Sequence, residues 1–237
     1  MIRIVNYSKS YRKGHYAVKN LNLEVKKGDL FAFIGHNGAG KSTTIKSIVG
    51  ILPFDEGEIY IDGVSIKENP VECKKQIAYI PDNPDLYESL TGIQYLNFIG
   101  DIFKVSSSKR KEIIEKYARE FELINDLNNL ISSYSHGMKQ KLAIISAFLH
   151  SPKLLVLDEP FVGLDPKAAF LVKKAMINFC AEGGAIFFST HVLEVAEKLC
   201  NKIAIIKKGE LIVSGLMEDV TKDASLEEVF MEQTLNE

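Results

Sequence analysis

The sequence feature that most constrains the fold is a glycine-rich stretch, GHNGAGKST, which begins at Gly35. It follows the apolar run LFAFI and precedes KSTTIKSIVGIL, whose apolar residues have helical spacing. A strand, a glycine turn and a helix in this order let successive backbone N–H groups point inward around a phosphate. The match to G-x-x-x-x-G-K-[ST] therefore predicts a phosphate-binding loop within an α/β fold.

The residues of this loop have distinct predicted roles. Lys41 is expected to reach the β- and γ-phosphates of a nucleotide, and the Ser42 hydroxyl is expected to face Mg²⁺. The helix that follows adds a favourable dipole at its N-terminus. The alternative, a glycine-rich turn without a ligand, is disfavoured by the complete motif. The predicted nucleotide-binding loop comprises Gly35, His36, Asn37, Gly38, Ala39, Gly40, Lys41, Ser42 and Thr43.

Two later apolar runs end in polar residues, as strands of the same sheet do where they deliver functional groups. LLVLDEP delivers Asp158, expected to hold Mg²⁺ through water, and Glu159, expected to orient or deprotonate an attacking water. AIFFST is followed by His191, expected to contact the γ-phosphate. In isolation an acidic pair can be a turn or helix cap, and a lone histidine can be structural. The upstream loop favours the functional interpretation of both.

The distribution of patterns along the chain indicates one α/β core interrupted by helices. IRIVNYS, AVKNLNLEV and GEIYIDG are predicted strands near the start, and KIAIIKKGELIVSG is a predicted strand region near the end. Between about residues 84 and 149 the patterns become helical, and KRKEIIEKYAREFELI has its apolar residues on one face. SLEEVFMEQTLNE is predicted to be a short amphipathic helix.

Composition excludes several classes. In 237 residues, 46% apolar and 25% charged side chains are typical of a soluble globular protein, and a formal charge of −2 gives no electrostatic case for nucleic-acid binding. Three cysteines without metal-like spacing indicate reduced thiols. The opening residues contain no signal-peptide core, and no apolar run is long enough to span a bilayer.

Taken in order, the three nucleotide elements resemble those of the ATP-binding cassette (ABC) ATPases over nearly the whole chain. The resemblance implies an α/β fold with a P-loop NTPase (RecA-like) core, an ABC-type antiparallel β subdomain and an inserted helical subdomain. It implies a single ABC ATPase domain over 1–237, with a core at about 1–83 and 150–215. The helical subdomain would span about 84–149 and a helical tail about 216–237. DEPFVGLDP resembles the second acidic motif followed by the D-loop, with Gly163, Leu164 and Asp165 matching.

The stretch YSHGMKQK stands where this family carries its LSGGQ signature, which clamps the ATP held by the opposite subunit. Ser135 keeps the hydroxyl and the helix-capping chemistry, and Gly137 keeps a close backbone approach. His136 replaces the first glycine of the pair. The resemblance implies that Ser135, His136 and Gly137 bind nucleotide in trans.

Two further positions follow from the resemblance. Tyr11 stands where the family places an aromatic residue that stacks on adenine; Tyr16 is a rival, and either tyrosine can be a plain surface residue. Asp82, in IPDNP, replaces the glutamine of the family's Q-loop. Its carboxylate can contact Mg²⁺ or a metal-bound water, or it can be a simple turn residue.

The sequence thus predicts an ATP- and Mg²⁺-dependent ATPase, the nucleotide-binding subunit of a transporter. The resemblance implies a second cassette, in a homo- or heterodimer, and separate membrane-spanning permease subunits. It places the chain in the cytoplasm on the inner face of the cell membrane. Asp82 and SLEEVF favour the bacterial exporter-type branch. Two alternatives are a soluble ABC ATPase that acts on the ribosome or DNA, and a nucleotide-sensing module without turnover. Glu159 and His191 disfavour the second.

Overall fold

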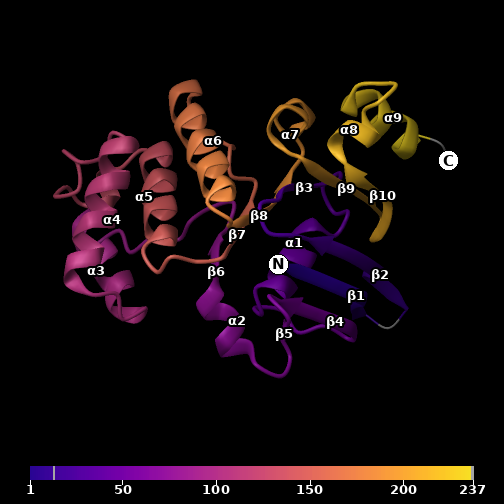
Figure 1. Cartoon of the computed structure of the whole chain (residues 1–237), viewed down its shortest axis with the longest axis horizontal. Helices are drawn as coiled ribbons and strands as arrows, with labels where there is room; N and C mark the ends of the chain where they lie inside the picture. The colour runs from indigo at the N-terminus through magenta and orange to yellow at the C-terminus, as the bar shows by residue number, and fades with distance from the viewer. Residues whose placement is uncertain (13, 236–237) are drawn as a thin grey trace.

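The computed structural model describes residues 1–12 and 14–235 and is built around two sheets (Figure 1). The larger sheet, over the described residues, has six strands in the order β10-β9-β3-β8-β7-β6. All its neighbours are parallel except the β9–β10 hairpin. The apolar runs that end in Ile34, Asp158 and Thr190 form its buried centre, as predicted. Its strands are β3 (Leu30–Ile34), β6 (Ile77–Ile80), β7 (Leu154–Asp158), β8 (Ala185–Thr190), β9 (Lys202–Lys207) and β10 (Glu210–Leu216).

The smaller sheet is antiparallel and has the order β2-β1-β4-β5 among the described strands. It lies beside the larger sheet, and α1 (Lys41–Ile48) lies between the two (Figure 1). Ile45 and Ile48 of α1 share one buried apolar cluster with residues of both sheets, so this helix packs the two sheets against each other. The strands are β1 (Ile2–Arg12), β2 (His15–Val25), β4 (Glu56–Ile61) and β5 (Val64–Ser65).

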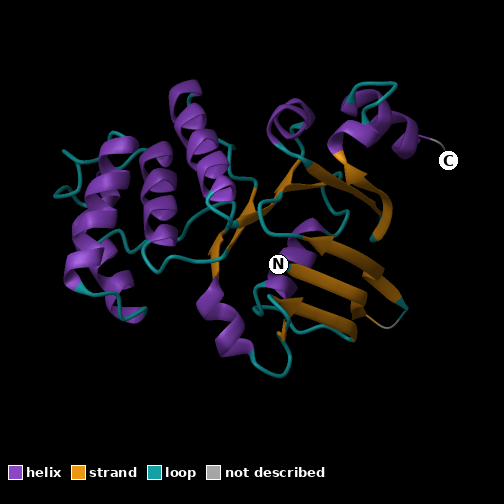
Figure 2. Cartoon of the chain, in the orientation of Figure 1, coloured by secondary structure: helices purple, strands orange, loops and turns teal. Residues whose placement is uncertain are grey.

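Most of the remaining helices gather in two places (Figure 2). The helices α3, α4 and α5 form a block at one end, as the texture of residues 84–149 predicted, and α7, α8 and α9 lie near β9 and β10. Their bounds are α2 (Pro70–Gln76), α3 (Gly92–Ile102), α4 (Ser107–Glu120), a 3-10 turn (Ile131–Ser133), α5 (His136–Phe148), α6 (Pro166–Ala181), α7 (Leu193–Leu199), α8 (Met217–Val220) and α9 (Leu226–Leu235).

Two helices end earlier than their apolar patterns suggest, each for a backbone reason. The helix after the glycine loop ends at Ile48 because Gly50 adopts a φ of +67°. The helix in residues 109–124 ends at Glu120, and Glu122 has a φ of +55° while the Leu123 N–H bonds the Ala118 carbonyl. The last two residues of the predicted tail helix lie outside the described residues.

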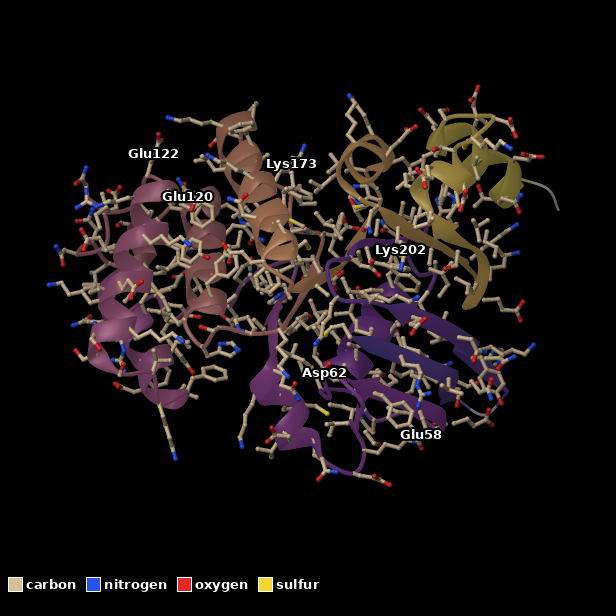
Figure 3. The ribbon with its side chains drawn as sticks, viewed as in Figure 1. Glu58, Asp62, Glu120, Glu122, Lys173 and Lys202 are labelled. Atoms are coloured by element: carbon tan, nitrogen blue, oxygen red, sulfur yellow. The ribbon has the colours of Figure 1, made fainter. Side chains whose placement is uncertain are left out.

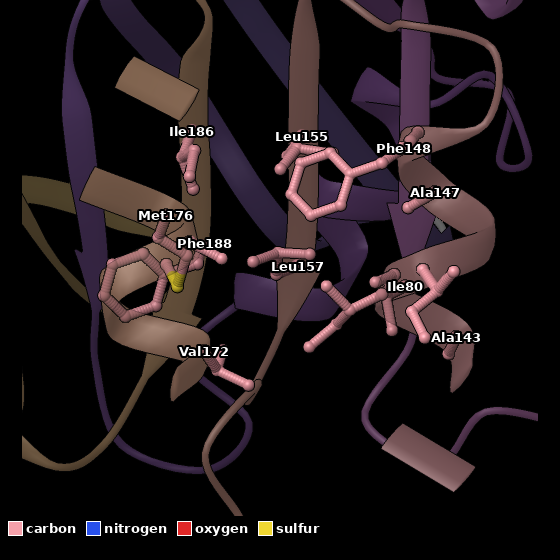
Figure 4. Packing of buried hydrophobic residues seen from close by; sticks show 14 of the residues in the cluster. Ile80, Ala143, Ala147, Phe148, Leu155, Leu157, Val172, Met176, Ile186 and Phe188 are labelled. Atoms are coloured by element: carbon pink, nitrogen blue, oxygen red, sulfur yellow. The ribbon is translucent and has the colours of Figure 1, made fainter. Parts of the chain in front are cut away.

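One face of the larger sheet packs against α5 and α6 (Figure 4). Figure 4 shows Leu155 and Leu157 of β7 between side chains of the two helices, with Phe148 on one side and Met176 on the other. Charged side chains lie around the outline, as Glu122 does at the edge of the helical block (Figure 3). This fold is the predicted α/β class. The division into a core, a helical subdomain and a tail stays a prediction.

Two expectations about the chain's environment can be compared with the structure. Within the described residues, no helix is both long and apolar enough to cross a bilayer. Cys73, Cys180 and Cys200 are all buried free thiols. Burial raises the pKa of the Cys180 thiol to about 12, which makes it a poor nucleophile at neutral pH.

Candidate functional site

The glycine loop between β3 and α1 has a backbone path that its glycines alone permit. Gly40 has a φ of +110°, and a Cβ at this position would come within 2.6 Å of the Ala17 carbonyl oxygen. A Cβ on Gly35 would come within 2.5 Å of the Ile206 carbonyl oxygen. Among residues 1–12 and 14–235, no side chain caps the start of α1. The free N–H groups of its first turn therefore remain available to an anion.

Lys41 is held inside this loop. Its Nζ donates to the carbonyl of Gly35 at 2.7 Å and to that of His36 at 3.3 Å. The side chain is only 7% exposed, and Nζ lies 4.0 Å from Oε1 of Glu159. Burial lowers the Lys41 pKa, and the charges of Glu159 and Asp158 partly oppose that shift. The ammonium group is thus poorly hydrated, which strengthens its attraction for a phosphate.

The acidic pair at the end of β7 is fixed by the neighbouring strand β8. Asp158 pairs in register with Ser189, whose hydroxyl donates to Oδ1 of Asp158. The backbone N–H of Glu159 bonds both the carbonyl and the hydroxyl oxygen of the same serine, each at 3.2 Å. Ser189 therefore holds the Asp158 carboxylate and the backbone of Glu159 in place.

Glu159 combines backbone strain with an unsatisfied carboxylate oxygen. Its φ of +49° is uncommon for a residue with a side chain. Oε1 lies 3.0 Å from Nδ1 of His191, which follows β8. Oε2 is buried and has no partner among the described residues. Such an oxygen can accept a hydrogen bond from a water molecule, including one that is also bonded to a phosphate oxygen.

Most of the predicted site residues line one cavity of about 370 Å³. His191 reaches it through Glu159, whereas the other predicted tyrosine, Tyr16, is exposed outside this lining. Ala17, which carries no predicted role, is part of the wall. The lining consists of Tyr11, Ala17, Asn37, Gly38, Gly40, Lys41, Ser42, Thr43, Asp82, Asp158 and Glu159.

Tyr11 is anchored to the glycine loop by its hydroxyl. Its oxygen lies 3.3 Å from Oγ1 of Thr43, and the side chain is 62% exposed. The hydroxyl of Tyr7, on the same strand, bonds Oγ of Ser47 at 2.9 Å within the core. These two tyrosines tie β1 to α1. Nζ of Lys9 lies over the Tyr11 ring, 5.6 Å from its centroid, and the exposed remainder of the ring is available to a planar ligand.

Asp82 has both of the features that its alternative interpretations require. Its Oδ1 accepts from the N–H of Asn83 at 2.9 Å, a bond typical of a turn. Its side chain also lines the cavity with Ser42 and Asp158. Among the described residues, no three acidic, histidine or cysteine side chains cluster tightly enough to hold a metal ion alone. The oxygen donors suit Mg²⁺, which usually takes its remaining ligands from phosphates and water.

The signature-like stretch lies away from the cavity lining, at the start of α5. The Ser135 hydroxyl caps this helix by accepting from the Met138 N–H at 3.3 Å. Tyr134 is buried, and its hydroxyl donates to the Asp126 carbonyl at 2.7 Å, so packing accommodates the unusual aromatic residue. The three residues predicted to act in trans, Ser135, His136 and Gly137, thus present a helix N-terminus outside their own subunit's cavity.

Two residues have roles that the sequence did not predict: Ser189, which bonds the acidic pair, and Tyr7, which ties β1 to α1 within the core. Ser189 stands in the predicted strand end FFST, and its contact with Asp158 depends on the strand register, for which the sequence holds no local signal. Tyr7 is buried although it is out of phase with the buried Ile2 and Ile4, because the strand register shifts between Ile4 and Tyr7, where Asn6 has a φ of +48°. A buried tyrosine hydroxyl needs a hydrogen-bond partner, but the sequence does not show which residue that partner is.

Comparisons with known proteins agree on one family. A family model described as ABC transporter matches residues 18–162, more than half of the chain. The chain is 34% identical over 222 residues to the ABC-type transporter ATP-binding protein EcsA of Bacillus subtilis (strain 168), covering 92% of this chain and 90% of that protein.

Solved structures agree as well. The structure of an ATP-binding subunit of an ABC transporter superposes with a TM-score of 0.93 at 35% identity, covering 98% of this chain and 99% of that one. The ATP-binding cassette MJ0796, solved as a dimer in a post-hydrolysis state with ADP and Pi, gives a TM-score of 0.82 at 25% identity, covering 92% and 99%.

Proposed function

The chain belongs to the ABC transporter family, as an ATP-binding subunit with ATPase activity coupled to transport, and from this premise we propose how its own residues do the work. The observation that carries the proposal is the single cavity lined by the glycine loop, Asp82, Asp158 and Glu159. It combines an anion cradle with an acidic pair at the carboxyl ends of parallel strands.

In this proposal the phosphates of ATP lie against the N–H groups of residues 35–43, and Lys41 neutralises charge at the transferred phosphoryl group. Tyr11 stacks on the adenine ring. Glu159 orients the attacking water and accepts its proton at the carboxylate. The 3.0 Å contact between Nδ1 of His191 and Oε1 of Glu159 leaves Oε2 for that water, and the imidazole contacts the γ-phosphate.

We propose Ser42, Asp158 and Asp82 as the groups that hold Mg²⁺. When bound, Mg²⁺ neutralises phosphate charge and orients the leaving group. The chain's own part is to supply oxygen donors around the cavity. The bond from Ser189 holds one Asp158 oxygen in place and leaves the other for the metal or its water.

We propose that two cassettes close head to tail, so that Ser135 and Gly137 of one subunit meet the γ-phosphate held by the other. Closure on ATP and opening after hydrolysis then drive the membrane partner between two states. The position of the α5 N-terminus, outside its own subunit's cavity, supports this arrangement.

The membrane partner is proposed to dock on the helical block. Tyr87, Phe98 and Ile102 are 56%, 41% and 56% exposed, and the rings of Tyr87 and Phe98 lie 5.5 Å apart. These apolar side chains follow Asp82 in the chain. A partner bound to them could therefore be coupled to the cavity through the segment that begins at Asp82. Docking there would place the subunit on the inner membrane surface. Co-purification of a membrane protein with the wild type, lost in a Tyr87→Ser and Phe98→Ser double variant, tests this surface.

Glu159→Gln tests the assignment of the catalytic base. The amide cannot accept the proton, so we expect phosphate release to fall at least about a hundredfold while ATP binding and a trapped dimer persist. Glu194→Gln is the matched control, because Glu194 is an exposed glutamate paired with Lys198 on the helix after His191. Normal turnover by Glu159→Gln refutes the assignment.

Two alternatives remain to be weighed. The comparisons give no support to action on the ribosome or DNA. The family's ATPase activity and a relative captured with ADP and Pi argue against a module that senses nucleotide without turnover. The exporter-type branch stays a prediction, which the direction of transport in vesicles would test.

A further inference from the structure

The ring of His136, the unusual residue of the signature-like stretch, lies on a loop of its own subunit. Its Nε2 is 3.3 Å from the carbonyl oxygen of Val162. Because a carbonyl can only accept, Nε2 carries the proton. Gly163 has a φ of +74°, and a Cβ there would lie 2.7 Å from Cδ2 and 3.1 Å from Nε2 of His136. The imidazole therefore covers the glycine closely and bonds the residue before it.

A second contact holds the same loop one turn further along α5. Gln140 is 1% exposed, and its Nε2 donates to the carbonyl oxygen of Pro160 at 3.4 Å. A Cβ on Gly137 would meet a methyl group of Leu164 at 3.8 Å, so the start of α5 and this loop lie side by side. The first turns of α5 thus contact the segment 160–164 at several points.

The segment 160–164 begins directly after Glu159. The Val162 N–H bonds the Glu159 carbonyl oxygen at 3.2 Å, which closes a tight turn. The carbonyl of Val162 that accepts from His136 is therefore in the same turn as the strained backbone of Glu159, whose φ is +49°. A shift of the α5 N-terminus moves this turn, and a displacement near 1 Å at a catalytic group is enough to slow a reaction strongly.

We propose that His136 is a positioning residue that couples the N-terminus of α5 to Glu159 of the same subunit. The inference rests on the proposed function, in which that N-terminus contacts ATP held by the partner. ATP in one subunit's cavity would then align Glu159 in the other subunit through the bond between His136 and Val162. A glycine at position 136, as in the family's usual signature, lacks this bond.

Turnover kinetics provide the first test. His136→Ala removes the bond, and we expect kcat to fall about tenfold, the rate equivalent of one ordinary hydrogen bond, while the KM for ATP stays within about twofold. His136→Gln can place an amide N–H near the position of Nε2, so it should restore kcat to within about threefold of the wild type. A structural role alone would not separate kcat from KM in this way.

A double-mutant cycle with Gly163→Ala tests the contact without nucleotide. In the wild type the new methyl group meets the His136 ring, whereas in His136→Ala only the backbone strain at a positive φ remains. Gly163→Ala should therefore lower the urea midpoint of unfolding more in the wild type than in His136→Ala. Equal shifts overturn the contact on which the proposal stands.

The remaining outcomes are equally decisive. If Gly163→Ala shifts the urea midpoint unequally in the two backgrounds but kcat is unchanged in His136→Ala, the contact is purely structural and the positioning role is overturned. A slow His136→Ala that His136→Gln does not restore overturns the hydrogen bond as the link. Absence of turnover in the wild type overturns the proposed function, and the role of His136 with it, and the cycle distinguishes that failure from a missing contact.

Discussion

The two glycines with positive φ inside the phosphate loop should differ sharply in their response to alanine. Gly38 has a φ of +82° and Gly40 a φ of +110°, so alanine is strained at both, at a cost of about 1–2 kcal/mol. The surroundings differ. Apart from its chain neighbours, no atom of the described residues lies within 4 Å of a Cβ on Gly38, whereas a Cβ on Gly40 meets the Ala17 carbonyl at 2.6 Å and Cγ2 of Val18 at 2.9 Å.

Gly40→Ala must therefore move backbone as well as adopt an unfavourable φ. Overpacking of a well-filled site costs about 1–3 kcal/mol, so we expect Gly40→Ala to be less stable than Gly38→Ala by that amount. For a chain of this length the difference corresponds to roughly 2–12 °C in Tm.

The assay is thermal unfolding of both variants without nucleotide, followed by circular dichroism, with the wild type as reference. Nucleotide is left out because Gly38 and Gly40 both line the cavity, and bound ATP would stabilise the three proteins unequally. Equal Tm values for the two variants, or a lower Tm for Gly38→Ala, would refute the steric reasoning.

Three further predictions follow from single contacts. Burial raises the Tyr7 pKa from 10.0 to about 12, so the stability from its protonated hydroxyl is complete below about pH 10 and lost as pH rises toward 12. Tyr7→Phe lacks this loss, so urea unfolding should show its stability relative to the wild type rising by about 1.4 kcal/mol between pH 8 and pH 11. Asp82→Asn keeps the acceptor for the Asn83 N–H but removes the charge; the Mg²⁺ concentration for half-maximal ATPase should rise about tenfold with Tm unchanged, and an unchanged requirement would leave Asp82 a turn residue. Tyr11→Ala should weaken binding of a fluorescent ATP analogue about tenfold and Tyr16→Ala less than about twofold, and the reverse ranking would exchange their roles.

The parts of the molecule that sequence predicts well are those whose requirements are local. The loop from Gly35 to Ser42 needs glycines for its own backbone and a strand and helix on either side, and all of these are adjacent in the chain. Asp158 and Glu159 were recognisable because a fully buried strand delivers them. Helix-forming texture over residues 84–149 was also visible, although the exact helix ends depended on left-handed residues such as Glu122.

Contacts that depend on strand register or on packing between distant segments were not predictable from the chain. The bond between Ser189 and Asp158 exists because β7 and β8 pair at those two positions. The contact between His136 and Val162 requires α5 to lie on a loop 26 residues later. One misprediction of a helix end leaves such pairs unaffected, whereas a shift of strand register by one residue would reverse every side chain on the strand.

The strand order also has a consequence for synthesis of the chain. Both sheet neighbours of β3, the strand that leads into the phosphate loop, come later in the sequence: β8 begins at Ala185 and β9 at Lys202. At a ribosomal rate of about 5–20 residues per second, roughly 8–30 s separate the appearance of β3 from that of β8. Throughout that interval the apolar residues LFAFI lack both of their strand partners, so the nascent chain exposes an unpaired strand that is prone to aggregate. Slower translation of residues 35–184 lengthens this exposure, so the need for a chaperone at this stage is expected to grow as translation of the segment slows.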